Sequence, residues 1–409
     1  MRQPPPAAAA TSGRRTVHHR HHLLTVAHHP LHRVASGLAH VPAGLLRQVG
    51  RAGPLESPWL ALGLGALVPA TVALIALSYH WPGRHAGPPR RRWLRRGALA
   101  AWLALLSVLA GLAGLNAYVG YVPTLPSLFG DLPVEIGHAA GGGGSSVVSF
   151  DIAAPSLRVP PSRCYVYLPP GYRSRAQRSR RYPVVYLLHG YPGGPIDWFR
   201  GAQVQETMDA LLADHLVQPM ILVAPNASGG WLHDSEMLNQ VGGPQVESYL
   251  VGTVVHTIDR RFRTIADRTG RAIGGMSSGG YGALNLGLRH QDVFSVILSL
   301  MPYGTPGTVT RALLGGSHAL WLANSPAAYI PTMAFHHPMA VELMAGDHDP
   351  EAKEAARLAR MLRARGQYAL FSEVHGAGHT WRAARVEAPY VLAFASGHLA
   401  GWESARGMT

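Results

Sequence analysis

Ser277 lies in the sequence Gly275-Met-Ser-Ser-Gly279, between a short strand-like run and a run that is compatible with a helix. This context predicts a nucleophile elbow, in which a strand turns sharply into a helix and presents a serine hydroxyl at the tip. Glycines are needed there because the turn is strained and neighbouring main chain approaches closely. The alternative is a glycine-rich loop without chemistry, so the prediction depends on whether the chain also supplies the partners of a serine nucleophile.

A serine hydroxyl is a weak nucleophile at neutral pH, and it needs a base to take its proton and an acid to orient that base. After an elbow, the expected chain order is serine, carboxylate, histidine. The apolar run 340–345 ends in Gly346-Asp-His-Asp-Pro350, which offers two carboxylates. We expect Asp349 to be the acid because it lies further into the loop, and Asp347 is the alternative acid. Either aspartate could instead form a turn or cap the next helix.

The base is expected at His379, in the glycine-flanked loop Gly376-Ala-Gly-His-Thr-Trp381 that follows a second strand-like run. The chain has 23 histidines, so the residue type alone selects none of them. Chain order and a loop position just before a helix select His379, whereas His375 would lie at the end of the strand. Such a triad predicts acyl transfer on the serine, and we expect neither a metal nor another cofactor.

The oxyanion of such a reaction needs preorganised N–H donors. One donor is expected at the backbone of Ser278, directly after the nucleophile. The second is expected in the loop that follows the apolar run 183–190, where Tyr191 has a usable N–H and Pro192 has none. A glycine-rich turn without a catalytic part is the alternative for this loop.

Three tryptophans fall in loops near the same predicted strand ends, at Trp198, Trp231 and Trp381. They are candidate substrate-binding residues that could line an acyl or aromatic pocket. Ordinary packing is at least as consistent with each of them.

Strand-like and helical runs alternate beyond residue 146, which predicts an α/β fold with a mostly parallel sheet covered on both faces. The first two strands have no helix between them and are expected to form an antiparallel edge. The expected strands are 147–152, 164–168, 184–189, 220–224, 272–274, 295–300, 340–345 and 369–374, and the expected helices are 203–215, 247–261, 280–289, 351–365 and 383–399.

The formal net charge of +14 is unevenly distributed. Residues 1–97 hold 13 arginines and one acid, a charge of +12, and the remaining residues therefore carry +2. Because the basic residues do not decorate the predicted α/β domain, a nucleic-acid partner is not expected. Gly-Lys-Ser/Thr does not occur, which excludes a Walker-type phosphate loop. Cys164 is the only cysteine, so neither an intrachain disulfide nor a cysteine-based zinc site can form.

Two uncharged apolar segments, 59–79 and 98–119, are long enough to cross a bilayer. Six arginines lie between them, at positions 84, 90, 91, 92, 95 and 96, and should hold that connection on the cytoplasmic side. This predicts a multi-pass protein of the cell membrane with an extracytoplasmic domain. Arg47 and Arg51, with fewer charges, favour the opposite orientation, and a buried helical hairpin in a soluble core is the alternative.

We therefore expect four parts along the chain. Residues 1–55 form a disordered basic, histidine-rich tail, for which metal binding is conceivable but composition bias is the simpler account. Residues 56–122 form the two transmembrane helices with their arginine-rich loop, and residues 123–146 form a linker that ends in Gly141-Gly-Gly-Gly-Ser-Ser146. Residues 147–402 form the catalytic domain.

Five segments are distinctive in combination: Tyr186-Leu-Leu-His-Gly190, Ile258-Asp-Arg-Arg-Phe-Arg263, Asp267-Arg268, Arg271-Ala-Ile-Gly-Gly-Met-Ser-Ser-Gly-Gly280 and Gly378-His-Thr-Trp381. On these segments, residues from about 147 to 400 resemble the α/β-hydrolase superfamily, in particular its esterase D or putative-esterase branch. That branch includes S-formylglutathione hydrolases, feruloyl esterases, enterochelin-esterase-like proteins and antigen 85-type mycolyltransferases. The front of the chain is similar to membrane-anchored members.

The resemblance implies Ser277 as nucleophile, His379 as base and an acid in the loop 347–349. It also implies Tyr191 as an oxyanion donor. We expect a serine esterase that acts on small-molecule or lipid esters. One alternative is an acyltransferase that moves lipid acyl groups to envelope glycans, although the mycolyltransferases usually have a glutamate as the acid. The other is a catalytically silent envelope-binding protein.

Overall fold

The computed structural model describes residues 23–24, 41–80, 89–128, 144–230 and 233–401. Its central feature is a nine-stranded sheet with the strand order β1-β9-β8-β7-β6-β4-β5-β3-β2. The strands are β1 (Leu23–Leu24), β2 (Ser146–Ala154), β3 (Val159–Leu168), β4 (Val184–Leu188), β5 (Ile221–Pro225), β6 (Arg271–Met276), β7 (Val296–Leu300), β8 (Ala340–Gly346) and β9 (Tyr368–Val374).

Strands β4 to β9 pair in parallel, and β3 pairs antiparallel with both of its neighbours, β2 and β5. The predicted α/β fold with a mostly parallel sheet is therefore confirmed, and so is its antiparallel edge. The direction of each strand follows from the length of its connection. Only a few residues join β2 to β3, which suits an antiparallel pair, whereas helices join the parallel strands.

Helices cover both faces of the sheet, and each face has its own apolar core. Val185 and Leu187 of β4 face one core, and Val184, Tyr186 and Leu188 face the other. This alternation is expected for a strand that is buried on both sides. The helices are α5 (Asp197–Arg200), α6 (Val204–Ala213), α7 (Val246–Ser248), α8 (Val255–Arg261), α9 (Ser278–Arg289), α10 (His318–Ala323), α11 (Pro326–Tyr329), α12 (Ala352–Ala364) and α13 (Trp381–His398).

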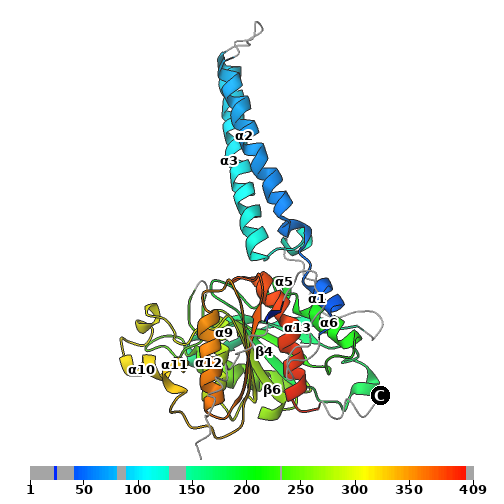
Figure 1. Cartoon of the computed structure of the whole chain (residues 1–409), viewed down its shortest axis with the longest axis vertical. Coiled ribbons are helices and arrows are strands. Elements are labelled where there is room, and N and C mark those ends of the chain that lie inside the picture. Colours follow the sequence, from blue (N-terminus) through cyan, green and yellow to red (C-terminus); the bar gives the residue numbers. More distant parts are fainter. Residues whose placement is uncertain (1–22, 25–40, 81–88, 129–143, 231–232, 402–409) are drawn as a thin grey trace, which may run out of the picture.

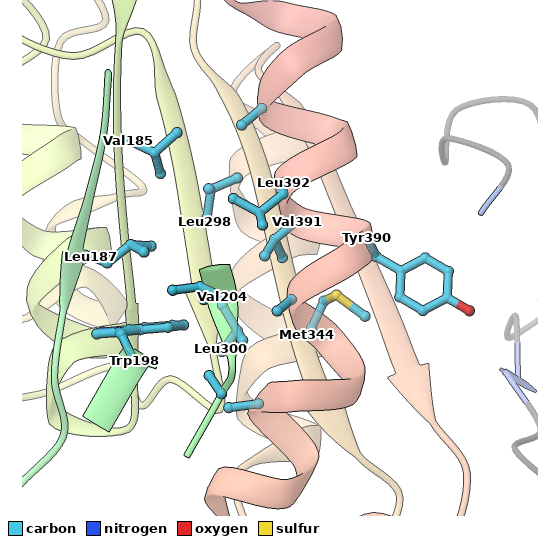
Figure 2. Packing of buried hydrophobic residues seen from close by; sticks show 14 of the residues in the cluster. Val185, Leu187, Trp198, Val204, Leu298, Leu300, Met344, Tyr390, Val391 and Leu392 are labelled. Atoms are coloured by element: carbon cyan, nitrogen blue, oxygen red, sulfur yellow. The ribbon is translucent and has the colours of Figure 1, made fainter. Parts of the chain in front are cut away.

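The first core lies between the sheet and helices α6 and α13, and Figure 2 shows it from close by. Val391 and Leu392 of α13 lie against Leu298 of β7, and Val204 of α6 lies below them. All four side chains are almost fully buried. Helices α8 and α9 cover the opposite face.

Helices α2 (Pro58–His80) and α3 (Pro89–Val119) pack against each other and project from the domain (Figure 1). Both are long and apolar enough to cross a membrane, over Pro58–Leu77 and Trp93–Val119, and only 6% of an apolar 18-residue stretch in each is buried. Length and composition make them candidate spans and show no more than that. Helix α3 begins at Pro89, so five of the six arginines expected in a loop lie in its first turns, because arginine is a good helix former.

The expectation of a disordered tail differs from the structure over residues 43–49, which form helix α1 (Ala43–Val49). Leu45 and Val49 are buried in the first core, and α1 packs against α6 and α13. Apolar residues that are four apart lie on one face of a helix, and α1 packs against the domain through this face. The same expectation is wrong at Leu23–Leu24, which form β1 and pair with β9. The histidines of the patch at 18–32, most of the predicted linker and Trp231 lie outside the described residues. Helix α4 (Leu125–Leu128) lies in the described first part of the predicted linker.

Candidate active site

Ser277 lies at the turn from β6 into α9, with φ 60° and ψ −121°. Its N–H donates to the Leu300 carbonyl over 2.9 Å, which ties the turn to the neighbouring strand β7. A Cβ added at Gly275 would lie 2.0 Å from the Gly279 carbonyl oxygen, and one at Gly279 would lie 2.2 Å from that of Leu188. Side chains at these two positions would therefore block the tight backbone contacts that hold Ser277 in its left-handed conformation.

His379 lies in the loop between β9 and α13, and its ring contacts both other predicted triad residues. The Ser277 hydroxyl donates to His379 Nε2 over 2.7 Å. On the other side of the ring, Nδ1 donates to Asp349 Oδ2 over 3.0 Å. This is the geometry in which a histidine can accept the serine proton while a carboxylate holds its tautomer.

The two candidate acids, Asp349 and Asp347, contact different histidines. The Asp349 side chain is fully buried, and its Oδ1 also accepts the Glu351 N–H over 2.8 Å. Asp347 instead pairs with His375 over 2.5 Å and accepts the Gly376 N–H over 2.7 Å. The His375 side chain is 55% exposed, so this second pair lies at the surface beside the buried one.

The three residues are far apart in the chain but meet at one edge of the sheet. Strands β6, β8 and β9 are parallel, so the loops that follow them emerge at the same edge. These are the loops that carry Ser277, Asp349 and His379. The carboxyl edge of a parallel sheet is where such folds assemble their sites.

The predicted oxyanion loop follows β4 at this same edge. A Cβ added at Gly190 would lie 3.4 Å from the Ser277 Cβ, so the residue before Tyr191 packs directly against the elbow. Ser278 is the first residue of α9, where backbone N–H groups have no acceptor within the helix. The predicted donors Ser278 and Tyr191 thus belong to two segments that both lie next to Ser277.

Two buried residues hold this loop, and the sequence reading assigned a role to neither. The Ala227 N–H donates to His189 Nε2 over 3.0 Å, so the ring proton is on Nδ1, which donates to the Gly190 carbonyl over 2.8 Å. Burial lowers the pKa of His189, in keeping with this neutral tautomer. Asp197 Oδ2 accepts the Gly194 N–H over 2.7 Å. An acidic residue three positions after a glycine-rich turn was the available signal for Asp197.

A pocket of about 560 Å³ borders this edge, and carboxyl and hydroxyl groups line it. Glu236 joins the pocket to the elbow, because it accepts hydrogen bonds from the Ser278 hydroxyl (3.2 Å) and from the Tyr303 hydroxyl (2.6 Å). Burial raises the pKa of Glu236 to about 8. The lining residues are Asp234, Glu236, Tyr303, Gly304, Thr305, Pro306, Gly307, Thr310, Glu351 and Glu354.

The two described tryptophan candidates, Trp198 and Trp381, do not line this pocket. Trp198 is fully buried and Trp381 is 6% exposed. Their rings pack edge to face with centroids 5.5 Å apart, within the first apolar core. Their position therefore favours packing over the substrate-binding role that was expected, because neither indole is accessible.

Glu387 of α13 is fully buried and lies near enough to Asp349 to be affected by its charge. Neither of its carboxyl oxygens has a hydrogen-bond partner among the described residues. Burial, together with the charge of Asp349, raises its pKa to about 8. A carboxyl group in such a position is protonated at neutral pH.

Replacing Glu387 with glutamine should make the protein progressively more stable than wild type as the pH rises from about 4.5 to about 8. In this window the unfolded wild-type carboxyl is ionised while the folded one keeps its proton, so folding takes up a proton and stability falls with pH. The amide does not titrate, and the difference between the proteins should grow by up to about 1.4 kcal/mol per pH unit. Melting temperatures of both proteins from pH 5 to 8.5 test this. Parallel curves would show that Glu387 is ionised in the folded state.

The parallel sheet, the helices on both faces and the sharp turn at Ser277 define a protein with an α/β-hydrolase-like fold. The model of the putative esterase family matches residues 161–399, and the chain belongs to this family. The match begins within β3, continues to the end of α13, and contains all the predicted site residues.

Several bacterial proteins are similar to parts of the chain. An endo-1,4-beta-xylanase/feruloyl esterase of Xylanibacter ruminicola is 33% identical over 132 residues, which are 32% of this chain and 18% of the relative. An esterase of Mycobacterium tuberculosis is 33% identical over 148 residues, which are 36% of this chain and 29% of the relative. A Corynebacterium glutamicum protein of unassigned function is 27% identical over 233 residues, 54% of each chain. The chain thus spans between about a fifth and about half of the length of these relatives.

Solved structures give the same picture of the fold. A ferulic acid esterase superposes with a TM-score of 0.53 at 25% identity, covering 63% of this chain and 99% of its own. An S-formylglutathione hydrolase from Agrobacterium tumefaciens also has a TM-score of 0.53, at 18% identity, covering 64% of this chain and 98% of its own. Both alignments leave more than a third of this chain unmatched.

Proposed function

We propose that this protein is a serine esterase that hydrolyses carboxylic esters through an acyl-enzyme intermediate. Ser277 is the nucleophile, His379 the general base and Asp349 the acid that orients the histidine. The observation that carries the proposal is the continuous chain of hydrogen bonds from the Ser277 hydroxyl through both ring nitrogens of His379 to the buried Asp349. Membership of an esterase family supports it independently.

In the first half of the reaction, His379 Nε2 takes the Ser277 proton while Ser277 Oγ bonds to the ester carbonyl carbon. The carbonyl oxygen becomes an oxyanion, which the backbone N–H groups of Ser278 and Tyr191 stabilise. The tetrahedral intermediate collapses, the bond to the alcohol oxygen breaks, and His379 returns its proton to that oxygen. The alcohol leaves, and the acyl group remains on Ser277.

In the second half, a water molecule replaces the alcohol. His379 takes a proton from the water, whose oxygen attacks the acyl carbon, and the same N–H groups hold the second oxyanion. Collapse releases the carboxylic acid and returns the proton to Ser277. Asp349 stays ionised throughout, and its role is to keep His379 in the tautomer that has its proton on Nδ1.

The proposal is tested on the full chain with a fluorophosphonate probe and with p-nitrophenyl esters of increasing acyl length. We expect covalent labelling of Ser277, with release of p-nitrophenol for at least one chain length. One of the relatives is named a feruloyl esterase, so a feruloyl ester is added to the series. A well-folded protein that neither reacts with the probe nor turns over any ester would overturn the proposal.

Activity should decline above about pH 8, because Glu236 becomes ionised there. Its pKa is raised to about 8, so the group is neutral at pH 7 and negative at pH 9. A negative charge beside Ser278 would oppose the oxyanion that forms at the Ser278 N–H. The measurement is the pH dependence of kcat/KM between pH 6 and 9.5, corrected for spontaneous hydrolysis of the ester.

Glu236→Gln should lose this alkaline decline, since glutamine can keep the hydrogen bonds but does not ionise. Glu342→Gln is the matched control, because burial also raises the pKa of Glu342 to about 8, but Glu342 is bonded to Ser372 within the sheet. The control should keep the wild-type profile. A decline that persists unchanged in Glu236→Gln would assign it to another group.

We further propose that α2 and α3 span the cell membrane and that the esterase domain lies on its extracytoplasmic side. The length and apolar character of the two helices support the span. The arginines at the far end of the hairpin support the orientation, because cationic residues favour the cytoplasmic side.

A further inference from the structure

The end of the α2–α3 hairpin that meets the domain is held by its own hydrogen bonds. We call residues 53–57 and 116–123 the hairpin foot. The Asn116 side chain donates to the carbonyls of Leu55 (2.9 Å) and Val122 (2.8 Å), and its oxygen accepts the Val122 N–H (2.8 Å). The Leu55 N–H donates to the Pro123 carbonyl (3.1 Å). The foot is therefore a compact unit that joins both helices.

A buried ion pair fixes the foot to the domain. Arg385 of α13 contacts both carboxylate oxygens of Glu56, at 2.9 and 2.6 Å, and both side chains are fully buried. The same guanidinium donates to the carbonyls of Gly120 in the foot and Gly201 in the domain, each over 2.8 Å. A charge buried at this depth is stable only with such a full set of partners, so the foot and the domain hold one relative position.

The foot meets the domain at the two loops that flank Ser277. The Tyr121 hydroxyl donates to Asp197 Oδ1, and the other oxygen of Asp197 holds the Gly194 N–H of the oxyanion loop. Tyr118 lies over the histidine loop, since its hydroxyl is 3.5 Å from the place where a Cβ on Gly378 would lie. Gly378 directly precedes His379. The hairpin thus stands on the edge of the sheet that carries the proposed catalytic residues, next to α5 (Figure 1).

The apolar part of each helix extends right down to this foot. The apolar segment of α2 begins at Pro58, and that of α3 ends at Val119. Trp59 and Tyr118, which lie beside these ends, are 79% and 67% exposed. Aromatic side chains of this kind favour the boundary between the hydrocarbon and the headgroups. A bilayer that covers the apolar segments would therefore have its surface at the level of the foot.

We propose that the active site opens at the surface of the membrane that its own hairpin spans, and that its substrates are amphiphilic esters lying in that membrane. The inference rests on the proposed esterase function. An ester anchored by an acyl chain in the outer leaflet would reach Ser277 by moving along the surface beside the foot. Confinement to the same surface raises the effective concentration of such a substrate well above that of a dissolved one.

The test uses the full chain reconstituted in phosphatidylcholine vesicles. A long-chain fluorogenic ester that does not exchange between vesicles is placed either in the vesicles that hold the enzyme or in a second, enzyme-free population mixed with them. We expect the ester in the enzyme's own vesicles to be cleaved at least about tenfold faster than the ester in the second population. Dissolving both mixtures in detergent should make the two rates equal.

Two further measurements distinguish the esterase function from the membrane-facing site. They are cleavage of a dissolved short-chain ester by the wild-type protein in vesicles and the same assay with the Ser277→Ala protein. Cleavage of the dissolved ester by wild type but not by Ser277→Ala establishes the esterase function whatever the result with vesicles. Equal rates for the two vesicle arrangements, or cleavage of the dissolved ester alone, would then overturn the membrane-facing site. Failure to cleave any ester would instead overturn the esterase function, and the further inference with it.

Discussion

Ser277→Ala and His379→Ala should each lower the kcat for ester hydrolysis by at least about 10³-fold. Removal of the hydroxyl takes away the atom that carries the acyl group, and removal of the imidazole leaves the hydroxyl without a base at 2.7 Å. Residual activity is expected from binding and from the oxyanion donors, which both variants keep. Steady-state rates with the best p-nitrophenyl ester, together with fluorophosphonate labelling, measure the effect.

His375→Ala is the matched control for the histidine. It lies four residues earlier in the same loop region and pairs with its own aspartate, but its side chain is 55% exposed. We expect the turnover of this variant to stay within about threefold of wild type. His375 pairs with Asp347 and not with a residue of the proposed triad, and loss of an exposed ion pair costs the fold little stability. Circular dichroism and melting temperature show whether each variant is folded. Near-normal turnover in folded His379→Ala would contradict the assignment of the base.

Asp349→Asn should lower kcat by about 10³- to 10⁴-fold and leave KM little changed. The asparagine amide can donate a hydrogen bond to His379 Nδ1, which would then carry no proton, and the proton on Nε2 would prevent that nitrogen from accepting the serine proton. The buried position of Asp349 adds to the effect. Water cannot reach the site to stabilise the charged imidazolium of His379 in place of the missing carboxylate.

Asp347→Asn, made two residues away in the same loop, should lose no more than a few-fold in kcat. Asp347 contacts His375 and the Gly376 N–H, and neither belongs to the proposed triad. The comparison of kcat and KM for the two variants therefore tests the choice of acid directly. A larger loss in Asp347→Asn than in Asp349→Asn would reverse the assignment.

Much of the fold can be read from local patterns in the sequence. The eight strands expected beyond residue 146 correspond to β2 to β9, because short apolar runs bounded by turn residues favour strands. The helix expected at 247–261 is interrupted in the structure, where a π-helical stretch, Tyr249–Val254, separates α7 from α8. Hydrophobic periodicity does not distinguish such a local change in helical winding.

The site residues with a local signature could also be named in advance, whereas the residues that support them could not. Ser277 and His379 lie in glycine-flanked loops in the chain order that the chemistry requires. The contacts of Tyr121 with Asp197 and of Glu236 with Ser278 join residues that are more than 40 positions apart in the chain. No local pattern marks such contacts, because they exist only after the sheet has brought its loops together.

Periodicity and turn chemistry in the sequence specify most of the strands and helices beyond residue 146, their order and the kinds of residue in the loops. Tertiary packing decides which aspartate contacts His379, whether Trp198 and Trp381 are buried, and where the hairpin meets the sheet. The cause is burial. Parallel strands bring distant loops to one edge, and the room left among those loops decides which side chains meet, which are enclosed and which face the solvent.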